Sequence, residues 1–358
     1  MTTRIFKHFP IAAMSALLAS CAGEGPRPYE QYGYQRPQAP ASRPVMQPPV
    51  AQYPGGHSQA SPSRGYSSGG LAGTYANYPA VRGFIQDMVR KHGFSESYLN
   101  GLFSRANRLD SVIRLESPEP SQGPSKPGSW TRYRNKFLTA QHIENGANFW
   151  LENADVLRKA SASYGVDQEY IVAIIGVETY FGRNFGKTNI FDSLTTLSFD
   201  THRRSQFFMS ELESFLLMAR EEDFDPREPE GSWAGAMGYG QFMPSSFRRL
   251  AIDFNHDGKR NLWHPHDAIG SVAHYFSKSG WHYNGQVARP SNGERNADGV
   301  IELSAYEGNE YWRIFPNFKV IKRYNNSNKY AMAVHQLAQA IKQRVASSGA
   351  LMRASSAR

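Results

Sequence analysis

The sequence predicts a mainly α-helical protein of the α+β class with one small β element. Apolar residues recur at helical spacing in most segments between residues 78 and 346, whereas strand-like runs are confined to a short stretch after residue 299. The chain has 358 residues, which is enough to bury one large core or two moderate ones. No internal repeat is visible, so a repeat architecture is not expected.

The first 21 residues have the features of an export signal. Arg4 and Lys7 are basic, residues 11–18 are mostly apolar, and a Leu-Ala-Ser-Cys sequence ends at Cys21. The apolar run is short for a membrane span, and its ending resembles a bacterial lipoprotein signal, in which the cysteine is lipidated. Cys21 is the only cysteine, so no intramolecular disulfide can form, and lipidation is favoured over a stray buried thiol.

The residue after Cys21 and the net charge predict where the protein works. Ala22 follows the cysteine rather than Asp, which in the enteric sorting pattern predicts a lipid anchor on the periplasmic side of the outer membrane. The net charge of +9 suits polyanionic surroundings. No nucleic-acid motif is present, so we expect cell-wall and lipid anions as partners, and no nucleic acid.

Residues 22–77 predict a disordered tether behind the anchor. Their composition of Pro, Gly, Ser, Gln and Tyr, with few aliphatic residues, cannot form a packed core. A coil of this length would span about 40 Å, so the folded part could reach away from the membrane. At the other end of the chain, residues 347–358 are predicted to form a flexible tail.

The folded part, residues 78–346, is predicted to consist mainly of amphipathic helices. Helices are expected at residues 81–91, 95–105, 139–164, 168–181, 210–220, 267–276 and 330–345. Residues 126–137 are predicted to be irregular, with an aromatic surface, and the segment that holds Asn189 and Asp192 is predicted to be a polar loop. Short runs at 300–303, 311–315 and 318–321 predict an antiparallel β element.

Glu178 stands where a helix should carry an apolar residue. Asp167 is the expected N-cap and Gly182 can end the helix. Glu178 continues the apolar face formed by Ile171, Ile174 and Ile175. Burial and the negative end of the helix dipole would both raise its pKa, which suits a general acid. A buried Arg partner, or a rotated helix with a solvated Glu178, remains open at this point.

A run dense in glycine follows at residues 231–246. Glycines there alternate with Trp, Met, Tyr and Phe, and they permit close backbone approach. The pattern predicts a groove wall for a flat ligand, with Ser232 and Gln241 as hydrogen-bonding groups. A structural loop with core aromatics explains the same pattern equally well.

Residues 253–267 match an EF-hand-like loop. Asp253, Asn255 and Asp257 occupy positions one, three and five, and Gly258 occupies position six. Position twelve holds a histidine instead of the usual Glu, but Asp267 could supply the closing carboxylate. We expect a weak, structural metal site here rather than a metal-free surface turn.

The remaining motifs exclude several classes of enzyme. The sequence has no HExxH, P-loop or dinucleotide motif, and its one cysteine is assigned to lipidation. One acid among aromatic and amide side chains suits a polysaccharide substrate. Glycosidases use two carboxylates, and Asp192 and Asp200 are weak candidates for the second. A single acid suffices where the substrate supplies the other group.

Four segments resemble the membrane-bound lytic murein transglycosylase B family. They read AIIGVETYFGRNFG, GSWAGAMGYGQFMPSS, DFNHDGKRNLWHPHDAIGSVAHYF and RYNNSNKYAMAV, and the similarity runs in order over residues 80–345. The resemblance implies a lysozyme-like catalytic core with an additional helical part. It also implies cleavage of the β-1,4 bond between N-acetylmuramic acid and N-acetylglucosamine in peptidoglycan glycan strands, with 1,6-anhydromuramyl products.

The resemblance also assigns roles to residues of this chain. Glu178 would be the single general acid/base, with no cofactor needed for the chemistry, and Ser232 would orient the acid or the N-acetyl group. The sugar subsites would be lined by Tyr133, Gln241, Phe242, Tyr275, Tyr324, Asn325 and Tyr330, with Phe207 and Phe208 as further groove aromatics. Structural Ca²⁺ would be held by Asp253, Asn255, Asp257, the Lys259 carbonyl and Asp267. Other cell-wall enzymes are further candidate partners.

Two other functions remain open from the sequence. In a lysozyme-type muramidase, water would replace the sugar's C6 hydroxyl. In a non-catalytic peptidoglycan-binding lipoprotein, the groove would bind without turnover. A calcium-dependent scaffold is a more distant third.

Overall fold

A computed structural model describes residues 65–116, 127–291, 293, 295 and 297–356 of the chain. The predicted export signal, Cys21 with its predicted lipidation, and most of the predicted tether lie outside these residues. Within them, no helix is both long enough and apolar enough to cross a membrane.

The folded part begins earlier than the sequence predicts. Tyr66 and Tyr75 are buried, and a short 3-10 helix, η3 (Gly73–Tyr75), precedes the first α-helix. The Tyr66 hydroxyl donates to Asp225 at 2.9 Å, and the Tyr75 hydroxyl donates to Asp200 at 3.0 Å. Residues 65–77 therefore pack on the core, and the prediction that they belong to the tether is wrong.

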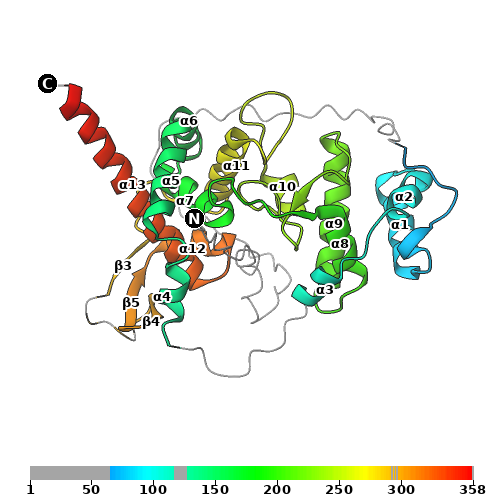
Figure 1. Cartoon of the computed structure of the whole chain (residues 1–358), viewed down its shortest axis with the longest axis horizontal. Coiled ribbons are helices and arrows are strands. Elements are labelled where there is room, and N and C mark those ends of the chain that lie inside the picture. The colour runs from blue at the N-terminus through cyan, green and yellow to red at the C-terminus, as the bar shows by residue number, and fades with distance from the viewer. Residues whose placement is uncertain (1–64, 117–126, 292, 294, 296, 357–358) are drawn as a thin grey trace, which may run out of the picture.

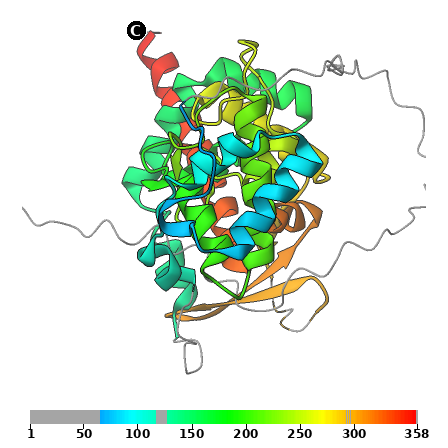
Figure 2. The same cartoon turned by 90° about the vertical axis from the view of Figure 1, so that its right-hand side faces the viewer.

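One end of the molecule is a group of helices (Figure 1), and Figure 2 looks along the long axis with α1 and α2 nearest the viewer. They are α1 (Pro79–His92), α2 (Glu96–Phe103), α3 (Asp110–Glu116), α8 (Ile190–Phe199) and α9 (Ser205–Glu221). The helices predicted at 81–91 and 95–105 are confirmed, and α9 begins at Ser205 rather than 210. Helix α8 replaces a predicted polar loop, because Asn189 is its N-cap and accepts from the Asp192 amide at 2.9 Å.

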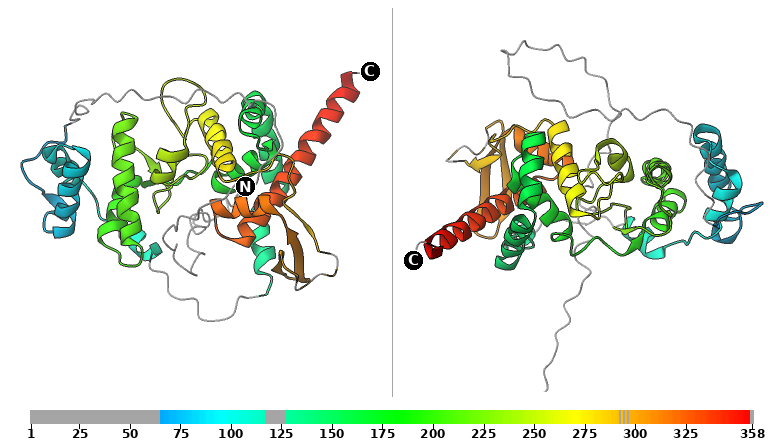
Figure 3. Two further views of the ribbon diagram at one scale, coloured as in Figure 1. Left: turned by 180° about the vertical axis from the view of Figure 1, so that it is seen from behind. Right: turned by 90° about the horizontal axis from the view of Figure 1, so that it is seen from above.

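Helix α7 (Gln168–Thr179) lies at the centre of the other part of the molecule (Figure 3). Its neighbours are α5 (Ala140–Glu152), α6 (Ala154–Tyr164), α11 (Pro265–Lys278) and α13 (Asn328–Ser356). Every residue from Glu169 to Val177 is buried. The apolar face inferred from three isoleucines is thus part of a helix that is enclosed on all sides.

Two predicted segments between residues 126 and 164 differ in the structure. Residues 126–137 contain helix α4 (Ser129–Arg134), and Trp130 and Phe137 are buried in the core, so they form no aromatic surface. The single helix predicted at 139–164 is broken at Asn153, which ends α5 and begins α6 with non-helical φ and ψ angles.

The β structure is small and antiparallel. Strands β1 (Thr188–Asn189) and β2 (Glu230–Gly231) pair with each other. A three-stranded sheet has the order β3-β5-β4, with β3 (Ala288–Pro290), β4 (Val300–Ala305) and β5 (Gly308–Ile314). The strand predicted at 318–321 is wrong. That segment belongs to helix α12 (Pro316–Tyr324). The helix begins with a proline, a residue that suits the first helical position.

The last helix joins the centre of the fold to the periphery. Helix α13 begins beside α12 and packs against α5 and α7, and its far end projects from the body of the molecule (Figure 1). It runs to Ser356, so most of the segment predicted as a flexible tail is helical. Helix α10 (Pro244–Leu250) follows the glycine-rich run and packs on α9.

Candidate active site

Glu178 lies in the last turn of α7, where the backbone changes hand. Tyr180, Phe181 and Gly182 follow with φ angles of 52°, 59° and 81°. The helix therefore ends at Thr179, earlier than the predicted end at Gly182, and two non-glycine residues take the left-handed conformation. Asp167 precedes the helix as predicted, but its carboxylate accepts from Trp281 Nε1 and the Asn284 amide instead of capping the helix.

The Glu178 carboxyl is largely shielded and, within the described part of the chain, has one close polar partner. The Tyr330 hydroxyl donates to Glu178 Oε1 at 2.5 Å. Burial raises the pKa of Glu178 to about 7, against the opposing effect of this hydrogen bond. Among the described residues no cation forms an ion pair with Glu178, so neither the buried Arg partner nor the solvated orientation is observed. A carboxyl with this pKa can hold a proton near neutral pH and release it again.

A cluster of tyrosines surrounds the acid. Tyr330 is buried and Tyr324 is partly buried, and their pKa values are raised well above the ordinary value, first by loss of solvent and then by the charge of Glu178. The rings of Tyr275 and Tyr324 have centroids 4.6 Å apart, and Phe242 lies 5.9 Å from Tyr275. Tyr133 is close enough for its charge to raise the pKa of Tyr330 further.

The glycine-rich run brings its backbone against this cluster. The Tyr324 hydroxyl donates to the Gly240 carbonyl at 2.6 Å, and a Cβ atom on Gly240 would lie only 2.8 Å from that hydroxyl oxygen. Gln241 has a φ of 50°, and its side-chain amide donates to the Phe185 carbonyl at 3.3 Å. Trp233, Met237 and Phe242 are buried. The run is therefore both a wall beside the acid and part of the core.

The other residues that were predicted to belong to the site have structural surroundings of their own. The Ser232 hydroxyl accepts from the Ala234 and Ala236 amides, so it holds the turn that shapes the wall. The Asn325 carbonyl accepts from the Ser327 amide at 2.7 Å in the turn before α13. Phe208 is buried on α9 and Phe207 is 41% exposed beside it.

The two carboxylates considered as second catalytic groups are engaged elsewhere. Asp192 accepts from the backbone and side-chain amides of Asn107. Asp200 accepts from the hydroxyls of Tyr75 and Tyr78 and from Arg108. Both hold the α1–α3 end of the molecule to α8, and neither carboxylate bonds to a residue of the Glu178 cluster.

The loop of residues 253–267 is closed by its own hydrogen bonds. Asp253 accepts from the Asp257 and Gly258 amides, and Asp257 Oδ2 accepts from the Asn255 side chain at 2.9 Å. Asp267 is buried, and its oxygens accept from the amides of Phe254, Asn255 and Asn261. The described residues contain no cluster of three or more His, Cys, Asp or Glu side chains suited to a metal.

The oxygen donors of this loop nevertheless suit a hard cation. Asp253 Oδ1 and Asn255 Oδ1 both accept from the Asp257 amide, so the loop brings an amide oxygen together with two carboxylates, and calcium prefers such oxygens together with a backbone carbonyl. Asp267 already ties both ends of the loop together through backbone amides. The donor set therefore fits calcium, with Asp267 serving at least as the residue that closes the loop.

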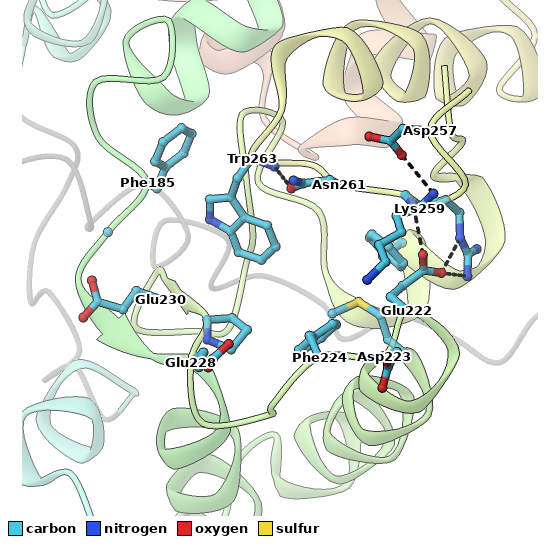
Figure 4. Close-up of a pocket in the computed structure, with 15 residues that line it drawn as sticks. Phe185, Glu222, Asp223, Phe224, Glu228, Glu230, Asp257, Lys259, Asn261 and Trp263 are labelled. Carbon is cyan, nitrogen blue, oxygen red and sulfur yellow. Dashed lines mark hydrogen bonds and ion pairs between the residues drawn. The ribbon is translucent and has the colours of Figure 1, made fainter. Parts of the chain in front are cut away.

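A cavity of about 600 Å³ lies between this loop and the end of α9 (Figure 4). Phe185 and Glu230 line one side, Asp257 and Lys259 line the other, and Trp263 stands between them. Glu178 is not among its lining residues. Phe185 joins the cavity to the acid site, because its carbonyl accepts from the Gln241 side-chain amide.

Sequence reasoning missed Thr179, the residue next to the acid. Its side chain is fully buried, and its hydroxyl lies 3.0 Å from the Tyr239 carbonyl oxygen in the glycine-rich run. A threonine at a helix end carries no sequence signal for such a contact, because the contact joins residues 60 positions apart.

Comparison with known sequences identifies the family. The profile described as "Transglycosylase SLT domain" matches residues 76–303 and 287–339. The chain is 46% identical over 308 residues to the membrane-bound lytic murein transglycosylase B of Escherichia coli strain K12, and the alignment covers 76% of this chain and 85% of that relative.

Solved structures agree with the sequence comparison. The Escherichia coli lytic transglycosylase SLT35 in complex with calcium matches with a TM-score of 0.72 and 45% identity, over 77% of this chain and 97% of that chain. SltB3 from Pseudomonas aeruginosa in complex with NAG-anhNAM-pentapeptide matches with a TM-score of 0.63 and 28% identity, over 74% and 78%. The predicted lysozyme-like, mainly α-helical fold is confirmed by these matches. The chain belongs to the SLT-domain family of lytic transglycosylases, enzymes that act on peptidoglycan.

Proposed function

We propose that Glu178 is the single general acid/base of this lytic transglycosylase. The observation that carries the proposal is a shielded carboxyl with a pKa of about 7 that accepts one hydrogen bond from Tyr330. Such a carboxyl is protonated in a large share of molecules near neutral pH, and it can also carry the negative charge for part of the cycle.

The reaction that one such group can perform is an internal transfer. Glu178 gives its proton to the bridging oxygen as the bond from the muramyl C1 to that oxygen breaks. The muramyl C6 hydroxyl then bonds to C1, and its proton returns to Glu178. The product has a 1,6-anhydromuramyl end, no water is consumed, and the acid is restored without a second carboxylate.

The tyrosine cluster supports the substrate role of the surrounding wall. The rings of Phe242, Tyr275 and Tyr324 pack against one another, with centroids 4.6 to 6.0 Å apart. Sugar faces stack on aromatic rings, and the Gln241 and Asn325 amides and Tyr133 add polar groups. We assign these side chains to the glycan subsites, with Ser232 shaping the wall behind them. Phe208 is left out, because it packs against Phe207 and Arg204 and makes no ring contact with this cluster within the described residues.

We also propose that the loop of residues 253–267 holds a structural Ca²⁺. Asp253, Asn255, Asp257 and the Lys259 carbonyl would hold the ion, and Asp267 would close the loop. The ion would supply rigidity and no chemistry. A relative 45% identical to this chain has been solved in complex with calcium.

The N-terminal sequence supports an anchored enzyme. We propose that Cys21 is lipidated and that the anchor lies on the periplasmic side of the outer membrane. The Escherichia coli relative carries "membrane-bound" in its name. Other cell-wall enzymes remain candidate partners.

Product analysis tests the mechanism. The mature chain should be incubated with purified sacculi and the released muropeptides measured by mass spectrometry. Anhydromuramyl ends, lighter by one water than hydrolytic products, are expected. Hydrated reducing ends would instead establish a lysozyme-type muramidase, and binding without release would establish a non-catalytic protein.

A further inference from the structure

The hydroxyl of Thr179 lies where three backbone segments meet. Thr179 is the last residue of α7, next to the acid, and its side chain is 0% exposed. Oγ1 lies 3.1 Å from the Ile175 carbonyl oxygen and 3.0 Å from the Tyr239 carbonyl oxygen. It also accepts from the Gly182 amide at 3.1 Å. One side chain thus touches the helix, the turn that follows it and the glycine-rich run.

The hydroxyl has one proton, so it can donate to one carbonyl at a time. The Ile175 carbonyl also accepts from the Phe181 amide at 3.3 Å. The hydrogen bond of the hydroxyl therefore adds more stability when the proton is donated to the Tyr239 carbonyl. In that arrangement the hydroxyl links the end of the acid's helix to the wall of the groove.

The turn after Thr179 needs such a link because its backbone is strained. Tyr180 and Phe181 both have positive φ angles, a conformation that persists only where the surroundings enforce it. The Asn184 amide donates to the Thr179 carbonyl at 3.0 Å, and the Gly182 amide donates to its hydroxyl. The carbonyl and the hydroxyl of Thr179 therefore both hold the turn that ends the helix directly behind Glu178.

The wall is also held from its other side, one residue further on. Thr179 binds the Tyr239 carbonyl, and the Tyr324 hydroxyl binds the next carbonyl, that of Gly240. Tyr324 precedes α13, whose first turn carries Tyr330, the hydrogen-bond donor to Glu178. Two hydroxyls on consecutive carbonyls thus fix the wall relative to the acid and to the acid's own partner.

We propose that Thr179 is a positioning residue, which sets the Glu178 carboxyl against the groove wall through its hydrogen bond to Tyr239. The inference rests on the catalytic role proposed for Glu178. Without the hydroxyl, the remaining contacts keep the wall and its aromatic rings in place, but the acid is no longer held in register with a bound glycan. The loss should therefore fall on turnover more than on substrate binding.

The test compares Thr179→Val, which has the same shape without the hydroxyl, with Thr179→Ser, which keeps the hydroxyl. On a soluble glycan of defined length, Thr179→Val should lower kcat by about tenfold to a hundredfold, the loss expected from misplacing a reacting group, while KM changes less than about threefold. Thr179→Ser should stay within about threefold of the parent in kcat. If Thr179→Val does not fold, Thr179→Ala removes the same hydroxyl and carries the test.

Thr195 supplies a matched control. It is also 0% exposed, and its hydroxyl makes no hydrogen bond within the described part of the chain. Thr195→Val therefore exchanges the same atoms without removing a bond, and it should leave kcat unchanged. Equal losses in both valine variants, an unaffected kcat in Thr179→Val, or no rescue by Thr179→Ser would overturn the proposal.

A Glu178→Gln variant in the same assay separates this inference from the function on which it rests. If Glu178→Gln retains activity, the role of Glu178 is wrong and Thr179 has nothing to position. If Glu178→Gln is inactive and Thr179→Val is as active as the parent, only the positioning role is wrong.

Discussion

The acid site and the loop of residues 253–267 use the same functional group in opposite ways. Glu178 meets a partner 152 residues away and is shielded, whereas Asp253 in the loop accepts from an amide five residues away near the surface. Burial raises the pKa of Glu178, while hydrogen bonds from Asn255 and the Lys259 amide lower the pKa of Asp257. A carboxyl becomes a proton donor or a cation ligand according to whether the fold or its sequence neighbours surround it.

The largest effect should come from removing the acid. Glu178→Gln keeps the shape of the side chain and an oxygen that can accept from Tyr330, so the fold should remain. Release of soluble muropeptides from sacculi should fall by about a thousandfold, within the usual range for general acid–base catalysis. Residual activity within tenfold of the parent would show that Glu178 is not the catalytic group.

The same substitution should change how stability depends on pH. The pKa of Glu178 is about 7 in the folded protein against an ordinary 4.5, so the folded state binds more protons between these values. Its stability therefore falls as pH rises through this window. Urea unfolding should show Glu178→Gln more stable than the parent at pH 8, by up to about 3 kcal/mol, and no more stable at pH 4. Parallel curves at both pH values would contradict the raised pKa.

The stability that the loop of residues 253–267 contributes should depend on calcium and not on this change in pH. In saturating calcium the melting temperature should rise by about 5 °C relative to chelator. Asp253→Ala combined with Asp257→Ala should remove that rise, because two of the carboxylate ligands are lost. A rise of the same size in the double variant would remove the metal assignment and leave the loop as a hydrogen-bonded turn.

Tyr330→Phe tests the hydrogen bond that the acid accepts from Tyr330. The Tyr330 hydroxyl favours the ionised carboxylate and lowers the pKa of Glu178. Without it the pKa should rise, so the alkaline limb of the pH–rate profile should move to higher pH. We expect a loss of about tenfold in kcat, since the ionised intermediate state loses a hydrogen bond to a charged group. An unmoved alkaline limb would indicate that another group sets it.

The smallest effect should come from a glycine in the loop. Gly258 has a φ of 90° with open space around its Cα, whereas a Cβ on Gly182 would lie 2.1 Å from the ring of Tyr239. Gly258→Ala should cost about 1 kcal/mol of stability from backbone strain alone. Gly182→Ala should cost more, because the ring must also move. Equal losses in the free energy of unfolding, measured with denaturant, would mean that the two regions tolerate an added Cβ atom equally well.

The sequence predicted those parts of the site that sit on one segment. Glu178 stood out as a polar interruption in an apolar helix, and the 253–267 loop has its donors at short, regular spacing. The tyrosines came only from family resemblance, because no local pattern links Tyr330 to Glu178. Thr179 was missed for the same reason, since its partner lies in a distant turn.

Errors in the fold have similar causes. Asn189 and Asp192 suggested a loop because Asn189 was not recognised as the N-cap of α8. The residues that follow this cap form a buried helix. Val320 and Ile321 suggested a strand, although Pro316 marks a helix start. The position of Trp130 in the core depends on its indole nitrogen reaching Glu310, which no neighbour in sequence indicates.

The hydrogen bond between Glu178 and Tyr330 also has a consequence in time. The chain is synthesised from its N-terminus, so the acid is made 152 residues before its partner, and Tyr324 arrives scarcely sooner. Until both tyrosines are present, Glu178 lacks the hydrogen bond from Tyr330, and the glycine-rich run lacks the hydrogen bond from Tyr324 to Gly240. The carboxyl proposed to cleave peptidoglycan therefore gains its hydrogen-bond donor only when the last part of the chain has been made and has folded.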